Sequence, residues 1–142
     1  MRATILFGFV LFGTWALPAC ELAQPGRGDI DVLLAQENEG ALLAATDRLA
    51  RYGAGARVPM EAALHGADER GRKNLILAMR RLGHPDAVPL LRHLALYDPA
   101  PAVRREAVSA LQAWATGSDG RAAKARAALR SIDEATKREE GA

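Results

Sequence analysis

The sequence predicts an all-α protein, a short α-solenoid of about three helix pairs followed by a C-terminal capping helix. Two observations lead to this fold class. Ala, Leu and Arg dominate the composition while Val, Ile, Tyr and Phe are scarce, so helix-forming residues greatly outnumber strand-forming ones. In addition, a pattern of apolar residues and prolines recurs after about thirty residues, and a period of this length is typical of stacked helical repeats.

Residues 1–19 are predicted to be a signal peptide. The stretch from Ala3 to Leu17 carries no charge and is apolar on every side, and Arg2 supplies a positive charge ahead of it. A short basic region before an apolar run is typical of secretory signal peptides. The run is shorter than the roughly 20 apolar residues that span a bilayer comfortably. We therefore expect an exported protein.

The cleavage point is expected at Cys20, the only cysteine of the chain. Conventional cleavage just before it would put Leu17 at the −3 position, where signal peptidase needs a small residue. Residues 17–20 (LPAC) instead resemble the lipobox of bacterial lipoproteins, although Pro18 departs from the usual residue at −2. The resemblance implies a lipid-modified Cys20, since two or more acyl chains anchor a protein stably. An ordinary signal peptide or an uncleaved N-terminal helix are the alternatives.

Charge and cysteine content exclude two classes of protein. The chain has 19 basic and 17 acidic residues and a net charge of +2, one unit of which comes from Arg2. Nucleic-acid binding needs a clustered excess of Lys and Arg, which is missing here. A single cysteine permits neither an intramolecular disulfide nor a cysteine-based metal cluster.

Residues 20–28, which contain the turn-forming sequence QPGRG, are expected to tether the anchor to the domain.

Two long segments of the chain repeat each other. Val58-Pro59-Met60 with Leu64 recurs thirty residues later as Val88-Pro89-Leu90 with Leu94. The apolar residues that follow recur at an offset of thirty-two, and the matching runs are Leu75, Ile76, Ala78, Met79, Leu82 and Ala107, Val108, Ala110, Leu111, Trp114. Each copy predicts a shorter A helix opened by proline and a longer B helix with an apolar stripe. Because Trp114 and Tyr52 share the stripe position of Leu82, all three are expected in the core.

Glycine, proline and aspartate set the expected helix boundaries. Glycine closes a helix most easily because it adopts a left-handed conformation, and aspartate caps helix N-termini. Candidate closing residues are Gly53, Gly83 and Gly117, and candidate caps or first-turn acids are Asp68, Asp86 and Asp119. Helices are predicted at 29–36, 39–52, 57–65, 69–82, 86–96, 101–115 and 120–138. These form one repeat domain, residues 29–138, followed by a tail, residues 139–142.

One unit of the repeat carries a family signature. It consists of His84-Pro85-Asp86-Ala87-Val88-Pro89-Leu90-Leu91, Leu94, Asp98-Pro99, Val103-Arg104, Ala107 and Ala110-Leu111. This pattern resembles HEAT repeats, in the short bacterial form that also occurs in phycobilin lyases. The resemblance implies a right-handed α-solenoid in which the loop residue Asp98 and the B-helix residue Arg104 form a structural ion pair. An armadillo array or a plain helical bundle would fit similar helices.

A partner-binding surface is expected on the B helices, which usually line the concave face of HEAT solenoids. The candidate residues lie outside the apolar stripe and are Lys73, Leu77, Arg80, Arg81, Arg105, Ser109 and Gln112. Leu77 is the most suggestive of them, because an exposed leucine between basic residues suits an acidic amphipathic segment. The alternative interpretation is an ordinary solvated helix face with extended arginine side chains.

No arrangement of residues predicts a catalytic site. His65, His84 and His93 form no HExxH motif and no pair of histidines spaced i, i+4. The serines of the chain lie outside any GxSxG sequence, and the glycines complete no phosphate-binding loop. We therefore expect neither enzyme activity nor a metal or cofactor.

Together these features predict a lipoprotein of the cell envelope, anchored to the inner or outer membrane through Cys20, that acts as a non-catalytic protein–protein interaction module. Its expected partner is a protein or peptide, and no nucleic acid is expected. If Cys20 is not lipidated, the protein would be periplasmic or secreted. Two other functions fit the sequence: an accessory or lyase-like subunit of an enzyme system, and a purely structural envelope lipoprotein.

Overall fold

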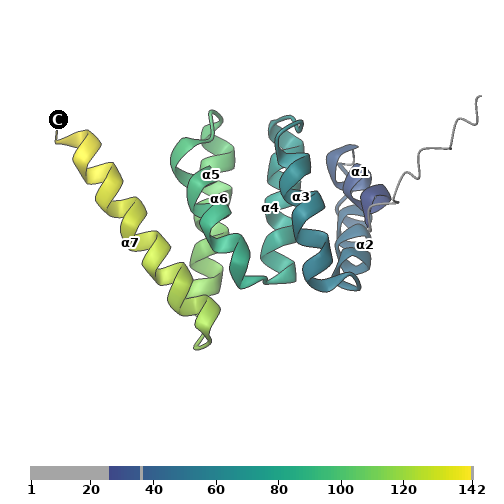
Figure 1. The fold of residues 1–142 in the computed structure, drawn as a ribbon. Coiled ribbons are helices and arrows are strands. Elements are labelled where there is room, and N and C mark those ends of the chain that lie inside the picture. Colours follow the sequence, from purple (N-terminus) through teal and green to yellow (C-terminus); the bar gives the residue numbers. More distant parts are fainter. Residues whose placement is uncertain (1–25, 36, 142) are drawn as a thin grey trace, which may run out of the picture.

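The computed structural model describes residues 26–35 and 37–141, and this part of the chain is all helical, without a β-strand. The α-helices are α1 (Arg27–Ala35), α2 (Glu39–Ala50), α3 (Arg57–Leu64), α4 (Glu69–Leu82), α5 (Val88–Tyr97), α6 (Pro101–Ala115) and α7 (Gly120–Glu140). Two short 3-10 helices, η1 (Gly53–Ala56) and η2 (Pro85–Ala87), precede α3 and α5. The pairs α1–α2, α3–α4 and α5–α6 stand side by side, with α7 at the end (Figure 1). The predicted short α-solenoid is confirmed.

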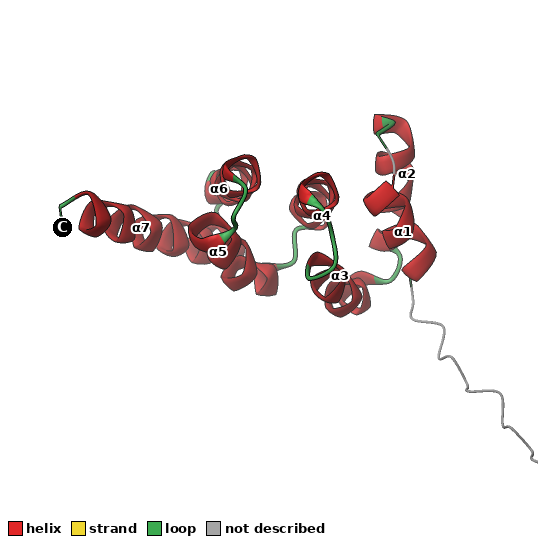
Figure 2. Ribbon diagram, turned by 90° about the horizontal axis from the view of Figure 1, so that it is seen from above, coloured by secondary structure: helices red, strands yellow, loops and turns green. Residues whose placement is uncertain are grey.

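The helices of successive pairs form two rows. Seen from above, α4 and α6 lie in one row, while α3 and α5 lie in the other (Figure 2). The B helix α4 packs against α2 and α1 on one side and against α6 on the other. No pair can bury its apolar side alone, so each unit depends on its neighbour for stability.

Several predicted boundary signals act as expected. The Asp68 carboxylate accepts a hydrogen bond from the backbone N–H of Gly71 at 2.7 Å and caps α4. Asp119 caps α7 in the same way, with a 2.8 Å bond from the N–H of Ala122. Gly83 closes α4 in a left-handed conformation with φ of +71°, which glycine adopts without a steric penalty.

The helix predicted at 86–96 differs in its first turn. Residues Pro85–Ala87 form the 3-10 helix η2, and α5 begins only at Val88. Proline has no N–H, so Pro89 cannot donate to the carbonyl of Pro85 as a continuous α-helix would require. The N–H of Val88 bonds to that carbonyl instead, which tightens the turn.

The ends of the domain also differ slightly from the predicted limits. Helix α1 begins at Arg27, inside the predicted tether of residues 20–28, and α7 runs to Glu140, inside the predicted tail. The last turn of α7 contains Lys137 and Arg138, whose positive charges favour a helix C-terminus. The predicted signal peptide and Cys20 lie outside the described residues. No helix of the described part is both long and apolar enough to cross a membrane.

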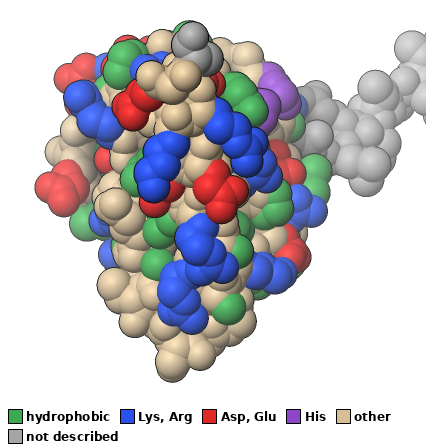
Figure 3. All heavy atoms as spheres, turned by 90° about the vertical axis from the view of Figure 1, so that its left-hand side faces the viewer, with side chains coloured by type: hydrophobic (Ala, Val, Ile, Leu, Met, Phe, Trp, Pro, Cys, Tyr) green, Lys and Arg blue, Asp and Glu red, His purple; other side chains and the backbone are tan. Residues whose placement is uncertain are grey.

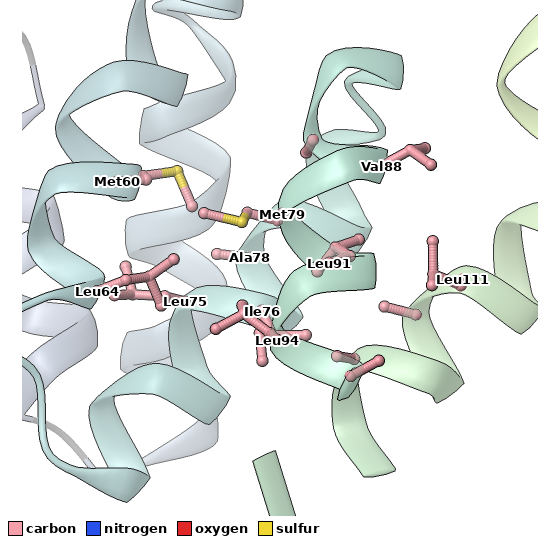
Figure 4. Packing of buried hydrophobic residues seen from close by; sticks show 14 of the residues in the cluster. Met60, Leu64, Leu75, Ile76, Ala78, Met79, Val88, Leu91, Leu94 and Leu111 are labelled. Carbon is pink, nitrogen blue, oxygen red and sulfur yellow. The ribbon is translucent and has the colours of Figure 1, made fainter. Parts of the chain in front are cut away.

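The core is one continuous cluster that runs through the units. Met60 and Leu64 of α3 and Leu91 and Leu94 of α5 converge on the buried side chains of α4 (Figure 4). Full burial of a large apolar side chain contributes about 1.5–3 kcal/mol, so this stacking is the main source of stability.

Two aromatic residues with equivalent sequence positions have different environments. Trp114 is buried as predicted, and its indole N–H donates to the carbonyl of Arg80 in the preceding unit at 2.9 Å. The prediction for Tyr52 is wrong, because its exposed fraction is 45%. Tyr52 follows the first described helix pair, so no preceding unit is present in the described chain to cover it.

Helix α7 closes the stack against α5 and α6. Its buried side is made largely of small residues, namely Ala122, Ala125 and Ala128 with Ile132, so the helix can approach its neighbours closely. On the end of the molecule that faces the viewer in Figure 3, Lys and Arg side chains are interspersed with Asp and Glu. This polar outer side is what a terminal unit of a solenoid needs.

Candidate partner-binding surface

The residues predicted for partner binding lie along α4 and α6, and the structure brings only some of them together. Leu77, Arg80, Arg81, Arg105 and Gln112 are exposed, whereas Lys73 and Ser109 are half-buried. Three of them, Leu77, Arg80 and Arg81, line one groove between α2 and α4. The residues on α6 and Lys73 do not belong to that groove.

The α2–α4 groove has a volume of about 290 Å³. Helix α2 contributes Leu42 and Leu43 to its lining, and α4 contributes Leu77. Leu43 is 40% exposed and Leu77 is 38% exposed, which is unusual for large apolar residues in this structure. Sequence reasoning missed the α2 side, although the apolar pattern of residues 39–52 already predicted a helix there.

The buried polar side chains that line the groove, Thr46 and Asn74, are hydrogen-bonded within the protein. Asn74 is buried and donates from Nδ2 to the carbonyl of Leu33 in α1 at 2.9 Å. The hydroxyl of Thr46 donates to the carbonyl of Leu42 at 2.8 Å. Because these groups already have partners, the attraction that the floor offers to a ligand is mainly apolar.

The two arginines of the groove each reach across to a neighbouring helix. Arg81 Nε lies 3.0 Å from Asp47 Oδ1 of α2, and Arg80 Nη1 lies 3.8 Å from Glu106 Oε1 of α6. All four side chains keep some solvent contact, and exposed pairs of this kind contribute at most about 1 kcal/mol. A carboxylate on a partner could therefore replace either acidic residue at little cost.

The predicted ion pair between Asp98 and Arg104 is wrong. The Asp98 carboxylate binds the guanidinium of Arg72 in the preceding unit instead, with Nε–Oδ2 and Nη2–Oδ1 distances of 2.8 and 3.0 Å. Arg104 lies in the first turn of α6, where its Nη1 donates to the backbone carbonyl of Asp98 at 2.7 Å. The carboxylate points toward α4 and also accepts the N–H of Ala100 at 2.9 Å. The loop is thus held within its own unit and also joined to the preceding unit.

A second groove lies on the opposite row, between α3 and α5. It has a volume of about 540 Å³, and His65, His93 and Tyr97 are among the side chains that line it. The ring centroids of His93 and Tyr97 are 5.1 Å apart. Within the described residues, no group of three His, Cys, Asp or Glu side chains could hold a metal ion. Sequence reasoning treated the histidines separately and did not predict that His65 and His93 share a groove.

Comparison with known proteins supports the repeat assignment. A family model for HEAT repeats matches residues 56–140, which is more than half of the chain and spans α3 to α7. No curated protein and no solved structure gives a significant match. The matched region carries the stacked helix pairs, the Arg72–Asp98 link between units and the closing helix described above. The chain therefore belongs to the HEAT repeat family.

Proposed function

We propose that this protein is a membrane-tethered, non-catalytic interaction module, whose α2–α4 groove binds an amphipathic helical segment of another cell-envelope protein. HEAT repeats are protein-interaction and scaffold modules, which supports the general function. The observation that carries the specific proposal is the presence of two partly exposed leucines, Leu43 and Leu77, on the two walls of one groove.

The charges at the groove define what the bound segment should look like. Arg80 and Arg81 lie in the last turn of α4, and Glu39 lies in the first turn of α2. Arg81, near the C-terminal end of α4, pairs with Asp47, near the C-terminal end of α2, so the two helices run in the same direction. The arginines therefore lie at the end of the groove opposite Glu39. A helix with apolar residues spaced at i, i+3 or i+4, and i+7 would fill the groove. Its acidic end would lie against the arginines.

The tethering part of the proposal comes from the sequence around Cys20. Residues 17–20 resemble a lipobox, and residues 21–25 leave only a short link before the described domain. Acyl chains on Cys20 would confine the groove to a membrane surface and raise the effective concentration of partners in the same membrane.

The tether is tested by metabolic labelling with radioactive palmitate. We expect label in the wild-type protein and none in Cys20→Ser, together with retention of wild-type protein in the membrane fraction. Equal labelling of the two proteins, or absence of label from both, would exclude the lipid anchor. This result would leave the groove proposal open to the separate test that follows.

The groove is tested by placing a photo-crosslinking amino acid at position 77 in living cells. We expect one discrete adduct, and mass spectrometry should map it to a segment with an amphipathic helical pattern and acidic residues at one end. Leu43→Ser should abolish the adduct without changing the circular dichroism spectrum. Tyr97, which is 65% exposed but lies outside the groove, provides the matched control position. The same adduct from position 97, or none from position 77, contradicts the proposal.

A further inference from the structure

The chain enters the domain at a fixed place, next to the C-terminal end of α2. Gly26 has φ of +80°, and a Cβ atom built on it would lie 2.5 Å from Leu49 Cδ2 and 3.4 Å from Tyr52 Cδ2. The backbone of Gly26 is therefore packed directly on these two side chains. Six residue steps separate Gly26 from Cys20, and an extended chain covers about 3.5 Å per residue, or roughly 20 Å in total. Lipid attached to Cys20 would hold this part of the domain close to the bilayer.

The surface around this entry point carries exposed apolar and basic side chains. Tyr52 is 45% exposed, and Val58, in the first turn of α3, is 59% exposed. Arg27 and Pro59 line one hollow between α1 and α3, so the start of α1 lies beside the start of α3. Arg51 is exposed beside Tyr52. We call Arg27, Arg51, Tyr52 and Val58 the entry corner.

Asp31 lines the same hollow as Arg27 and offsets its charge, so the basic character of the entry corner comes from Arg51. Arg48 is paired with Asp29 at 2.5 Å, and Arg57 is paired with Glu61 at 2.6 Å. In the described part of the chain, the Arg51 side chain forms no ion pair. Arginine attracts anionic headgroups, and tyrosine is enriched at membrane interfaces because its ring is apolar and its hydroxyl polar. The composition of the corner therefore fits a lipid surface better than bulk water.

We propose that the entry corner rests on the surface of an anionic phospholipid bilayer and sets the orientation of the solenoid on the membrane. This inference rests on the lipid anchor of the proposed function and adds a contact between the folded domain and the bilayer. The C-terminal end of α2 belongs to this corner, and Asp47 near that end pairs with Arg81. The arginine end of the α2–α4 groove would consequently lie near the membrane, where it would receive juxtamembrane segments of partners.

The test uses the acylated protein in lipid vesicles with a spin label at position 58. Acylation blocks the Cys20 sulfur, so Val58→Cys supplies the single reactive thiol. Ala127→Cys, on an exposed position of α7, is the matched control. In vesicles of phosphatidylcholine with phosphatidylglycerol, we expect the label at 58 to be several times less accessible to an aqueous nickel complex than the label at 127. Flotation of the vesicles and palmitate labelling report independently on the anchor.

A second variant isolates the electrostatic part of the contact. Each unit of positive charge at an anionic surface is worth about 1 kcal/mol. Because Arg51→Glu changes the charge by two units, it should lower the ratio of docked to undocked domain about thirtyfold. If the protein floats with the vesicles but the label at position 58 is as accessible to the nickel complex as the label at 127, the inference is overturned while the anchor stands. Equal protection in pure phosphatidylcholine, insensitivity to Arg51→Glu, or magnetic coupling between labels of two copies would also overturn it. Failure to float or to take up palmitate removes the anchor and the inference together.

Discussion

Replacing Asp98 by alanine should test whether one buried ion pair couples two repeat units. The Asp98 side chain is only 2% exposed and that of Arg72 is 17% exposed. The carboxylate accepts three hydrogen bonds, two from Arg72 on α4 and one from the N–H of Ala100 at the start of α6. The substitution therefore removes a link between units and an acceptor at a helix N-terminus in one step.

The expected loss of stability depends on the interactions that Arg72 keeps after Asp98 is replaced. Removal of one partner of a buried ion pair costs about 3–5 kcal/mol, because the other charge stays buried. Arg72 would still donate to the carbonyl of Ala67 at 2.8 Å and would keep partial contact with water. We therefore expect Asp98→Ala to lower the free energy of unfolding by about 3 kcal/mol, out of a typical total of 5–15 kcal/mol for a domain.

The assay is urea unfolding followed by circular dichroism, with Trp114 fluorescence as a second probe. Asp98→Ala, Arg72→Ala and the double variant form a double-mutant cycle whose coupling energy should reach about 2 kcal/mol. The exposed pair Asp47–Arg81 provides the control cycle, which should give at most about 1 kcal/mol. A loss below about 1 kcal/mol in Asp98→Ala, or equal coupling in the two cycles, would refute the reasoning.

Three further changes should alter stability in the same unfolding assay. Gly28→Ala should raise the free energy of unfolding by roughly 0.5 kcal/mol, because Gly28 is helical and its added Cβ would meet nothing within 4 Å; a loss would contradict this. Asp119→Ala should cost about 1 kcal/mol through loss of the cap on the N–H of Ala122, and Asp119→Asn should restore most of it. Trp114→Phe should cost at least about 1 kcal/mol, since the carbonyl of Arg80 loses its indole donor; unchanged stability would show that the bond is unimportant.

Local signals in the sequence were sufficient for the helices but not for the contacts between them. The apolar spacing and the capping residues predicted every α-helix of the described chain within a few residues, because these signals act within one or two turns. Asp98 shows where such reasoning stops: its nearest basic residue in the family pattern is Arg104, but its carboxylate faces Arg72, 26 positions earlier in the chain. The pairing depends on how two units stack, which spacing inside one unit does not encode.

The candidate surface was predicted only in part for the same reason. Leu77 was recognised as a leucine outside the apolar stripe of its own helix. Its counterpart Leu43 was not, because the groove exists only where α2 packs beside α4. The partners of Arg80 and Arg81 likewise lie on other helices. Tyr52 was misplaced because its position in the repeat predicts burial only when a preceding unit covers it.

The polar outer side of α7 has a consequence for how copies of the protein meet. A stack of similar units exposes an apolar side at each open end, and such ends can join head to tail into filaments that never close. With α7 in place, the terminal surface carries charges of both signs instead. A second copy therefore finds no exposed apolar surface at this end on which it could stack. The same helix that completes the core of its own molecule thus helps to keep neighbouring molecules apart.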